Sequence, residues 1–322
     1  MKINSICILG GSGFVGRHLI PALANGQRKI RVLSSHPQRA RHLLVSPGVE
    51  LVKADVFDPA SLRNHFTGFD CVINLVGILN ESRAKHRGFR AVHVELPTLI
   101  AESSSAAGVS RLLHMSALQA DSARGTSLYL RTKGEGENRI AVAGSSNLSV
   151  SVYKPSVMFG PGDKFLNRFA SLLRMSPLMF PLACPNARFA PVYVGDVVEA
   201  MLQTLDAADA KGVHYELCGP EQLTLRELVQ YTATNIGSTS YIVGLSDRLS
   251  RIQARILQWV PGKPFSLDNY LSLQTDSICS KDGFAQLGIT PRSLGEIVPG
   301  YLGQSGQAAR LDRWRARAGR NV

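Results

Sequence analysis

The chain has 322 residues, of which 44% are hydrophobic and 19% charged, and its formal net charge is +12. This length allows one large α/β domain or two smaller ones, and the composition is that of an ordinary globular protein. No apolar run approaches the ~20 residues that span a bilayer. Because the N-terminus enters a strand pattern directly, we expect no cleavable signal.

The positive charge is concentrated at both ends of the chain. Seven Lys and Arg residues precede the first acidic residue, Glu50, and five Arg face only Asp312 between positions 310 and 320. Both regions place few aromatic side chains among the basic ones, unlike a surface for single-stranded nucleic acid. We therefore expect no nucleic-acid partner.

Five cysteines are scattered along the chain without a C-x-x-C pair: Cys7, Cys71, Cys184, Cys218 and Cys279. This spacing indicates small core residues of a reduced, cytoplasmic protein. We expect neither a disulfide framework nor a metal site.

The N-terminal segment predicts a nucleotide-binding turn. An apolar strand pattern over 6–9 ends in glycines, and a helical pattern begins at once. The glycines suit a tight turn, an approach of bare backbone to a pyrophosphate, and close packing of helix on strand. Unpaired N–H groups at the helix N-terminus attract the phosphates. A tight turn that binds no ligand is the alternative. The candidate cofactor-binding residues are Gly10, Ser12, Gly13, Phe14, Val15, Gly16 and Arg17.

The end of the second predicted strand, 28–33, favours NADP(H) over NAD(H). Sites that prefer NAD place a carboxylate about 20 residues beyond the glycines, where it binds the adenosine ribose. Hydroxyl and basic side chains stand there instead, and these bind a 2′-phosphate that a carboxylate would repel. The candidates are Ser34, Ser35, His36, Arg39 and Arg41, with Arg17 from the first helix. Arg39 and Arg41 fit a solvated helix face equally well.

Two further strand ends are predicted to contact the cofactor. Asp55 and Val56 follow a strand at 49–53, where they suit the adenine amino group and ring. A turn or helix-capping role for Asp55 fits the spacing as well. The strand at 71–76 leads to a glycine that lets backbone approach the second ribose. The candidates there are Leu75, Val76 and Gly77.

The fifth predicted strand and the helix after it carry a candidate catalytic set. Ser116 ends the strand, and Tyr129 and Lys133 lie at i and i+4 on one face of the following helix. A phenol titrates near pH 10, and a nearby ammonium lowers its pKa. Tyr129 therefore suits a general acid/base, with Ser116 binding the same substrate oxygen. A surface tyrosine beside a helix lysine is the alternative. His93, in the largely helical segment 81–108, is expected near the core or the cofactor.

These motifs resemble those of the extended or atypical short-chain dehydrogenases/reductases, the epimerase-like superfamily. The matching stretches are Gly10 to Gly16, Asp55, 74–77, Ser116, Tyr129 to Lys133 and 154–162. More narrowly, the chain is similar to bacterial relatives of the nucleotide-binding accessory subunit of respiratory complex I. That similarity lies in 114–118, 129–137, 159–169, 191–198 and 299–302.

The resemblance implies a cofactor site and two opposite functional outcomes. It implies NAD(P) binding by Gly10, Gly13, Gly16, Asp55, Tyr129 and Lys133, with Pro155 and Ser156 packed beside the nicotinamide. It also implies an acid/base role for Tyr129. In the complex I branch, by contrast, it implies a structural nucleotide without turnover. The intact Ser-Tyr-Lys set argues against a degenerate site.

The second half of the chain is predicted to alternate shorter elements. Strands are expected at 150–155 and 188–193, and helices at 165–175 and 247–260. A further helix is expected from a cap at Asp196 to about 205, and another begins at a capping box over 224–227. Arg188 is expected to meet an anionic substrate group or to form a structural salt bridge. The basic amphipathic segment 247–260 fits a membrane surface or a quinone-binding partner, or else a solvated basic face.

We therefore expect an α/β fold, a doubly wound Rossmann-type parallel sheet with a smaller C-terminal substrate lobe. The expected division is 1–162 with 186–210, then 163–185 with 211–302, and a mobile basic tail, 303–322. The first functional hypothesis is an NADP(H)-dependent oxidoreductase or epimerase with an unknown small-molecule substrate. The second is a non-catalytic subunit of a respiratory membrane complex, held at the inner face of the membrane through the basic helix and tail.

Overall fold

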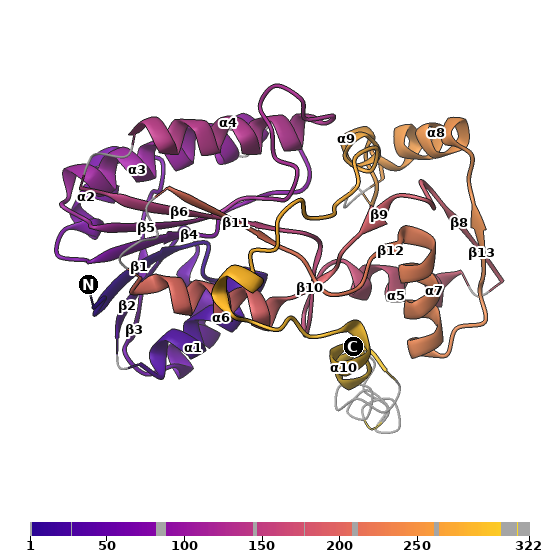
Figure 1. The fold of residues 1–322 in the computed structure, drawn as a ribbon, viewed down its shortest axis with the longest axis horizontal. Coiled ribbons are helices and arrows are strands. Elements are labelled where there is room, and N and C mark those ends of the chain that lie inside the picture. Colours follow the sequence, from indigo (N-terminus) through magenta and orange to yellow (C-terminus); the bar gives the residue numbers. More distant parts are fainter. Residues whose placement is uncertain are drawn as a thin grey trace. The chain divides into compact units, whose positions relative to one another are not determined.

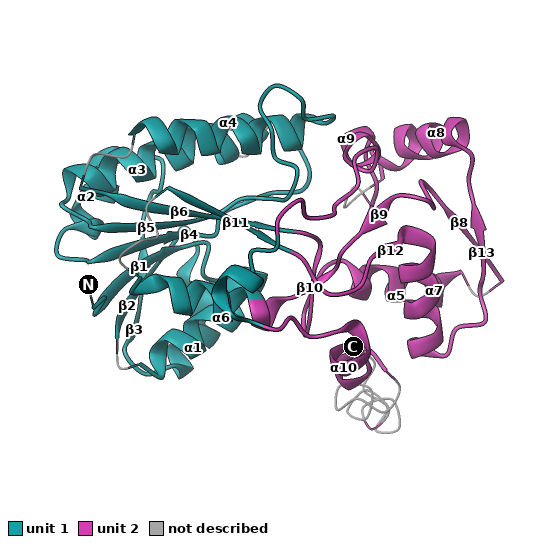
Figure 2. Cartoon of the chain, viewed as in Figure 1, with its two compact units in different colours: residues 1–155, 197–217, 282–289 teal, residues 156–196, 218–281, 290–322 magenta. Residues whose placement is uncertain are grey.

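The computed structural model describes residues 2–26, 28–81, 88–143, 147–176, 178–207, 212–260, 264–303 and 314. The chain divides into two compact units (Figure 2). Unit 1 contains 1–155, 197–217 and 282–289, and unit 2 contains 156–196, 218–281 and 290–322.

Unit 1 is built on a seven-stranded parallel sheet with the strand order β11-β6-β5-β4-β1-β2-β3. Its strands are β1 (Ser5–Leu9), β2 (Lys29–Ser34), β3 (Val49–Lys53), β4 (Cys71–Asn74), β5 (Arg111–Met115), β6 (Ser149–Pro155) and β11 (Val213–Leu217). The order reverses at β1, which pairs with both β2 and β4. This reversal is the switch point of a doubly wound sheet, beside which such folds bind ligands. The predicted fold class is confirmed.

Helices cover both faces of this sheet (Figure 1). On one face lie α2 (Pro59–Phe66), α3 (Leu96–Ala106) and α4 (Leu128–Ala143), and on the other lie α1 (Phe14–Ala24) and most of α6 (Val194–Leu205). A 3₁₀ segment, η1 (Pro37–Val45), follows β2, and a π-helical turn, η2 (Ala91–Glu95), precedes α3. Phe66, Leu96, Ile100 and Ile140 pack with Val72 into one apolar core.

Two predicted elements of unit 1 differ in detail from the structure. The fourth strand ends at Asn74 rather than at position 76, because the side-chain oxygen of Asn74 accepts the N–H of Val76 at 3.0 Å. The predicted helical segment 81–108 contains 82–87, which lie outside the described residues. Beyond them it is helical, with the π-turn η2 inserted before α3.

Unit 2 combines short helices with three two-stranded sheets, β10-β7, β12-β9 and β13-β8. The strands are β7 (Met158–Phe159), β8 (Met179–Leu182), β9 (Arg188–Phe189), β10 (Val192–Tyr193), β12 (Leu223–Thr224) and β13 (Tyr241–Gly244). The helices are α5 (Leu166–Met175), α7 (Leu225–Ile236), α8 (Asp247–Leu257), α9 (Leu267–Ser272) and α10 (Leu294–Tyr301). The predicted capping box is confirmed, since Thr224 and Glu227 each accept the other's backbone N–H.

Asp196 does not cap α6, contrary to the sequence prediction. The helix begins at Val194, so Asp196 lies within its first turn. Its buried carboxylate accepts the N–H of Arg292 at 2.7 Å and pairs with the Arg292 guanidinium at 2.8 Å. Asp196 therefore holds the loop before α10 within unit 2.

The expectation of no disulfide was wrong for one pair of cysteines. Cys218 and Cys279 form a disulfide in unit 2, with Cα atoms 6.0 Å apart and a sequence separation of 61. Cys218 directly follows β11, and Cys279 lies in the loop after α9, so only the tertiary fold brings them together. The pairing removes the argument for a reducing compartment. Cys7, Cys71 and Cys184 are free.

Candidate functional site

The glycine-rich turn between β1 and α1 has the backbone geometry that phosphate binding requires. Gly10 has φ +77°, and a Cβ there would lie 2.8 Å from the carbonyl carbon of Leu75. A Cβ on Gly16 would lie 2.2 Å from the oxygen of Gly11. Gly13 is the N-cap of α1, so the N–H groups of the first helical turn point out of the helix end. This turn fits the pyrophosphate of a dinucleotide.

All seven strands are parallel, so their carboxyl ends lie together on one side of the sheet. The other candidate cofactor residues lie along this side, which we call the cofactor edge. Ser34 ends β2, and its hydroxyl accepts the N–H of His36 at 3.2 Å. Arg39 lies in η1 and is exposed, as is Arg17, whose Nε donates to the oxygen of Ser12 at 3.1 Å. The phosphate-binding interpretation of Ser34 and Arg39 is compatible with these positions.

Asp55 lies just beyond β3 and forms a local turn. Its Oδ1 accepts the N–H of Phe57 at 2.9 Å, while Asp58 caps α2 by accepting the N–H of Ala60 at 3.0 Å. Asp55 therefore forms the turn, and the helix cap is formed by Asp58. The Asp55 side chain is exposed at the cofactor edge, with Val56 half-buried beside it. Adenine binding by these two residues stays a prediction.

The segment after β4 meets helix α4 at Lys133. Leu75 donates its N–H to Leu9 at 2.9 Å, which ties the segment to the end of β1. A Cβ built on Gly77 would lie 3.7 Å from the Lys133 Nζ, so the end of this side chain reaches the segment. The structure thus brings a predicted cofactor-binding glycine to the predicted catalytic lysine within one unit.

Lys133 is a buried cation. Its Nζ donates to the carbonyl oxygen of Met115 at 2.8 Å, and 4% of the residue is exposed. Burial lowers the Lys133 pKa from 10.5 to about 8, and the nearby Glu137 carboxylate opposes this shift. At neutral pH, Lys133 is therefore mainly protonated.

Glu137 is a site residue that sequence reasoning missed. It follows Tyr129 and Lys133 on the same face of α4. Its Oε1 accepts the hydroxyl proton of Ser116, and its Oε2 lies 3.2 Å from the Lys154 Nζ. The single hydroxyl proton of Ser116 is therefore engaged by Glu137 in this structure. The i+4 spacing from Lys133 was the available signal.

His93 links the cofactor edge to α4. Its Nε2 accepts the N–H of Ile78 at 3.2 Å, so Nδ1 carries the proton and donates to Thr132 Oγ1 at 3.2 Å. Burial, with a contribution from the charge of Lys133, lowers the His93 pKa to about 2. His93 therefore stays neutral and acts as a connector, near the cofactor edge as the sequence predicted.

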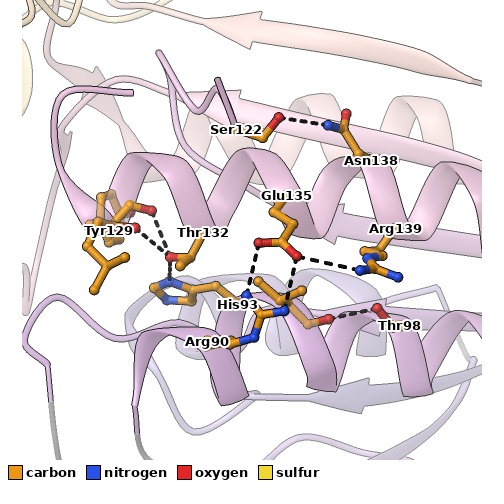
Figure 3. A network of polar contacts seen from close by, with 11 residues as sticks. Arg90, His93, Thr98, Ser122, Tyr129, Thr132, Glu135, Asn138 and Arg139 are labelled. Carbon is orange, nitrogen blue, oxygen red and sulfur yellow. Dashed lines mark hydrogen bonds and ion pairs between the residues drawn. The ribbon is translucent and has the colours of Figure 1, made fainter. Parts of the chain in front are cut away.

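Tyr129 lies beside His93 at the start of α4 (Figure 3). Its ring meets those of His93 and Phe89 edge-on, with centroids 5.4 Å and 5.9 Å away. Further along α4, Glu135 pairs with Arg90 at 3.4 Å and with Arg139 at 3.7 Å. The Arg90 pair links α4 to the segment that precedes η2, whereas the Arg139 pair lies within α4 itself.

Pro155 and Ser156 fall on either side of the boundary between the units. Pro155 ends β6, and its oxygen accepts the N–H of Leu118 at 3.0 Å in unit 1. Ser156 begins unit 2, where its hydroxyl donates to the Ser277 oxygen at 2.7 Å. Their predicted place beside a nicotinamide stays a prediction.

Unit 2 contains a separate cavity of about 260 Å³. It is lined by Cys184, Pro185, Asn186, Ala187, Leu245, Ser246, Asp247, Ser250, Leu273 and Gln274. Burial raises the Cys184 pKa to about 11, so this thiol is a poor nucleophile. Arg188 is exposed and donates to Gln222 at 3.2 Å. In the part of the chain that the structure describes, no cluster of His, Cys, Asp and Glu could hold a metal.

The doubly wound sheet, the glycine turn at its switch point and the Tyr-Lys face of α4 define an NAD(P)-binding Rossmann-type protein. Comparison with known proteins agrees with this class. Residues 6–218 match the model of the NAD dependent epimerase/dehydratase family, and the chain belongs to that family.

Curated relatives include both respiratory subunits and a reductase. Subunit 9 of the NADH dehydrogenase [ubiquinone] 1 alpha subcomplex from Rattus norvegicus is 31% identical over 296 residues, 89% of this chain and 76% of that protein. The match to its Mus musculus counterpart, also at 31%, spans 70% of this chain and 59% of that protein. A ceramide reductase from Caulobacter vibrioides is 30% identical over 260 residues, 77% of this chain and 73% of that protein.

Solved structures share the fold over nearly the whole chain. The dTDP-glucose 4,6-dehydratase DesIV from Streptomyces venezuelae, solved with NAD bound, has a TM-score of 0.71 at 19% identity and covers 97% of each chain. The NADPH-dependent quinone oxidoreductase QOR2 from Escherichia coli, complexed with NADPH, has a TM-score of 0.69 at 19% identity, covering 90% and 97%.

The buried charge of Lys133 predicts a pH-dependent stability that a Lys133→Met variant lacks. The Lys133 pKa is about 8 in the folded chain and 10.5 in the unfolded chain. Between these two pH values the unfolded chain therefore binds more protons than the folded chain. The wild type is therefore destabilised at neutral pH, and its free energy of unfolding increases as pH rises from about 8 to 10.5. The variant's free energy of unfolding, minus that of the wild type, should fall by about 2–3 kcal/mol between about pH 7 and pH 10.

Urea unfolding of both proteins across this pH range measures the difference. Lys53→Met is the matched control, because Lys53 is exposed at the end of β3. A difference that does not change with pH for Lys133→Met would contradict the burial of a charged amine.

Proposed function

We propose that this chain binds NADP(H) along the cofactor edge of unit 1 and catalyses hydride transfer to or from a carbonyl or hydroxyl substrate. The observation that supports this most is the proximity of Gly77 to the Lys133 side chain, since a Cβ built on Gly77 would lie 3.7 Å from the Lys133 Nζ. We infer from it that the nicotinamide end lies beside the Tyr-Lys face of α4. The proposed cofactor residues of unit 1 also include Gly10, Gly13, Gly16, Asp55, Val56 and Pro155. The nicotinamide would supply the hydride chemistry.

The chain's own residues would bind the substrate oxygen and move its proton. Tyr129 donates the proton to that oxygen during reduction and removes it during oxidation. The Lys133 ammonium favours the phenolate form of Tyr129. Because the single proton of a substrate hydroxyl goes to Tyr129, Ser116 would bind the substrate oxygen as a donor, after its hydroxyl turns from Glu137. His93 bonds to Ile78 in the segment after β4 and to Thr132 in α4, and so links this segment to the helix that carries Tyr129.

Changing Tyr129 to Phe should lower turnover by about 10²-fold or more, the usual contribution of a general acid/base. The affinity for NADPH should change little, because phenylalanine keeps the ring contacts with Phe89 and His93. The measurement is NADPH oxidation with a panel of aldehydes, ketones and quinones, together with NADPH binding by fluorescence.

Tyr241→Phe is the control, since Tyr241 is 73% exposed in unit 2. Equal rates for the wild type and Tyr129→Phe would exclude Tyr129 as the acid/base.

The preference for NADP(H) is proposed from the residues that follow β2. Ser34 and the exposed Arg39 stand where a 2′-phosphate is bound in such folds, and no carboxylate precedes Glu50 in the chain.

Arg39→Ala should weaken NADPH binding by about tenfold, the loss of one charge-assisted phosphate contact, and leave NADH binding nearly unchanged. Titration of both nucleotides by intrinsic fluorescence or calorimetry tests this. Arg63→Ala, an exposed arginine of α2, is the control. Parallel losses for NADPH and NADH would show that Arg39 does not recognise the 2′-phosphate.

The respiratory relatives favour a second candidate function, in which the chain is a nucleotide-binding subunit of a membrane oxidoreductase. In this proposal Tyr129 and Lys133 hold NADPH without turnover, and the protein is cytoplasmic and peripheral to the inner face of the membrane. Recovery of the chain with a respiratory complex, together with NADPH binding and no oxidation by any acceptor, supports it. Fractionation without a partner at physiological salt contradicts it.

A further inference from the structure

Helix α8 presents an apolar stripe to solvent. Four large side chains point away from the core with 51%, 51%, 62% and 82% of their surface exposed: Leu249, Ile252, Ile256 and Trp259, the last just beyond the helix. The small side chains of Ser250 and Ala254 face inwards and are fully buried. A surface helix normally turns its large apolar residues towards the core, so α8 shows the reverse arrangement.

Polar contacts on the inner side fix the rotation of α8 about its axis. Ser250 Oγ accepts the N–H of Cys184 at 3.1 Å. Asp247 Oδ1 accepts the hydroxyl proton of Tyr270 in α9 at 2.7 Å. Both contacts lie within unit 2 and anchor the first turns of the helix. The outward apolar stripe is therefore a defined feature of the folded unit.

A row of arginines runs beside the apolar stripe. At about 100° per residue, the four apolar residues fall within an arc of about 80°, and Arg248, Arg251 and Arg255 occupy an adjacent arc of about 60°. The three arginines are exposed, and none forms an ion pair with another described residue. The solvent-facing surface of α8 is thus half apolar and half cationic.

This pattern is typical of a helix that lies in a membrane interface. Such helices bury an apolar stripe at the boundary of headgroups and acyl chains while basic residues meet anionic lipid, and tryptophan prefers that depth. The 11 residues of α8 are too few to span a bilayer, and no helix of the described ranges is long and apolar enough to do so. The net charge of +12 adds a long-range attraction to an anionic surface.

We propose that α8 docks flat on an anionic lipid bilayer, with Leu249, Ile252, Ile256 and Trp259 inserted below the headgroups and the three arginines at the phosphates. The charge complementarity identifies the occupant, because an apolar protein groove would leave a row of three exposed arginines without counter-charges. This membrane contact is independent of nucleotide binding in unit 1 and of any reaction there.

Vesicle sedimentation of the full chain tests the proposal. The wild type should bind phosphatidylglycerol vesicles and bind phosphatidylcholine vesicles much more weakly. The double variant Ile252→Ser/Ile256→Ser should lower the partition coefficient on phosphatidylglycerol at least about tenfold, because two apolar side chains no longer insert. Arg251→Ala should lower it about fivefold, the usual contribution of one basic residue at an anionic surface.

Two matched controls separate this surface from general effects. Val142→Ser removes an apolar side chain that is 85% exposed in α4, and Arg63→Ala removes an exposed charge in α2; both should bind as the wild type does. Equal binding by the wild type and both α8 variants would overturn the proposal. That result is also expected if the basic tail alone attracts the vesicles.

Trp259 gives a direct readout of insertion. The chain has two tryptophans, so a Trp314→Phe background leaves Trp259 as the single reporter. Addition of phosphatidylglycerol vesicles should shift its emission to the blue and protect it from acrylamide. Binding of the vesicles without either change would place the contact elsewhere and contradict the proposal.

Discussion

The burial of the Lys133 ammonium is the constraint on which the candidate site depends. The amine donates to the carbonyl of Met115 at the end of β5, lies beside Gly77 and has Glu137 one turn further along α4. Removing a cation from water is costly, so its surroundings must supply a carbonyl and a negative charge. The hydrogen bond from Lys133 to Met115 therefore ties α4, which covers one face of the sheet, to the carboxyl end of β5.

Glycines make this close packing of α4 possible. A Cβ on Gly136 would lie 1.9 Å from the oxygen of His93, so the helix approaches η2 more closely than any other residue would permit. His93 then bridges Ile78 and Thr132, and its ring supports Tyr129. These ring contacts with His93 and Phe89 position the phenol of Tyr129 on the face of α4 that also carries Lys133.

The sequence predicted those parts of the fold and site that depend on local pattern. The positions of the strands, the glycine turn before α1 and the Tyr129–Lys133 spacing on one helix follow from apolar periodicity and short spacing. The doubly wound parallel class follows from the alternation of strands and helices. Contacts between distant segments were not predictable. Ser116 meets Glu137, and Cys218 meets Cys279, only because separate elements converge, and the rotation of α8 depends on Ser250 bonding to Cys184.

The central claim is that a nucleotide on the glycine turn places its nicotinamide beside Tyr129 and Lys133. A crystal structure of the full chain with NADPH tests it most directly. We expect the pyrophosphate over Gly10 to Gly16, the 2′-phosphate near Ser34 and Arg39, and the nicotinamide ribose within hydrogen-bond distance of Lys133. A nucleotide whose nicotinamide lies away from α4, or that binds outside unit 1, would rule out this site.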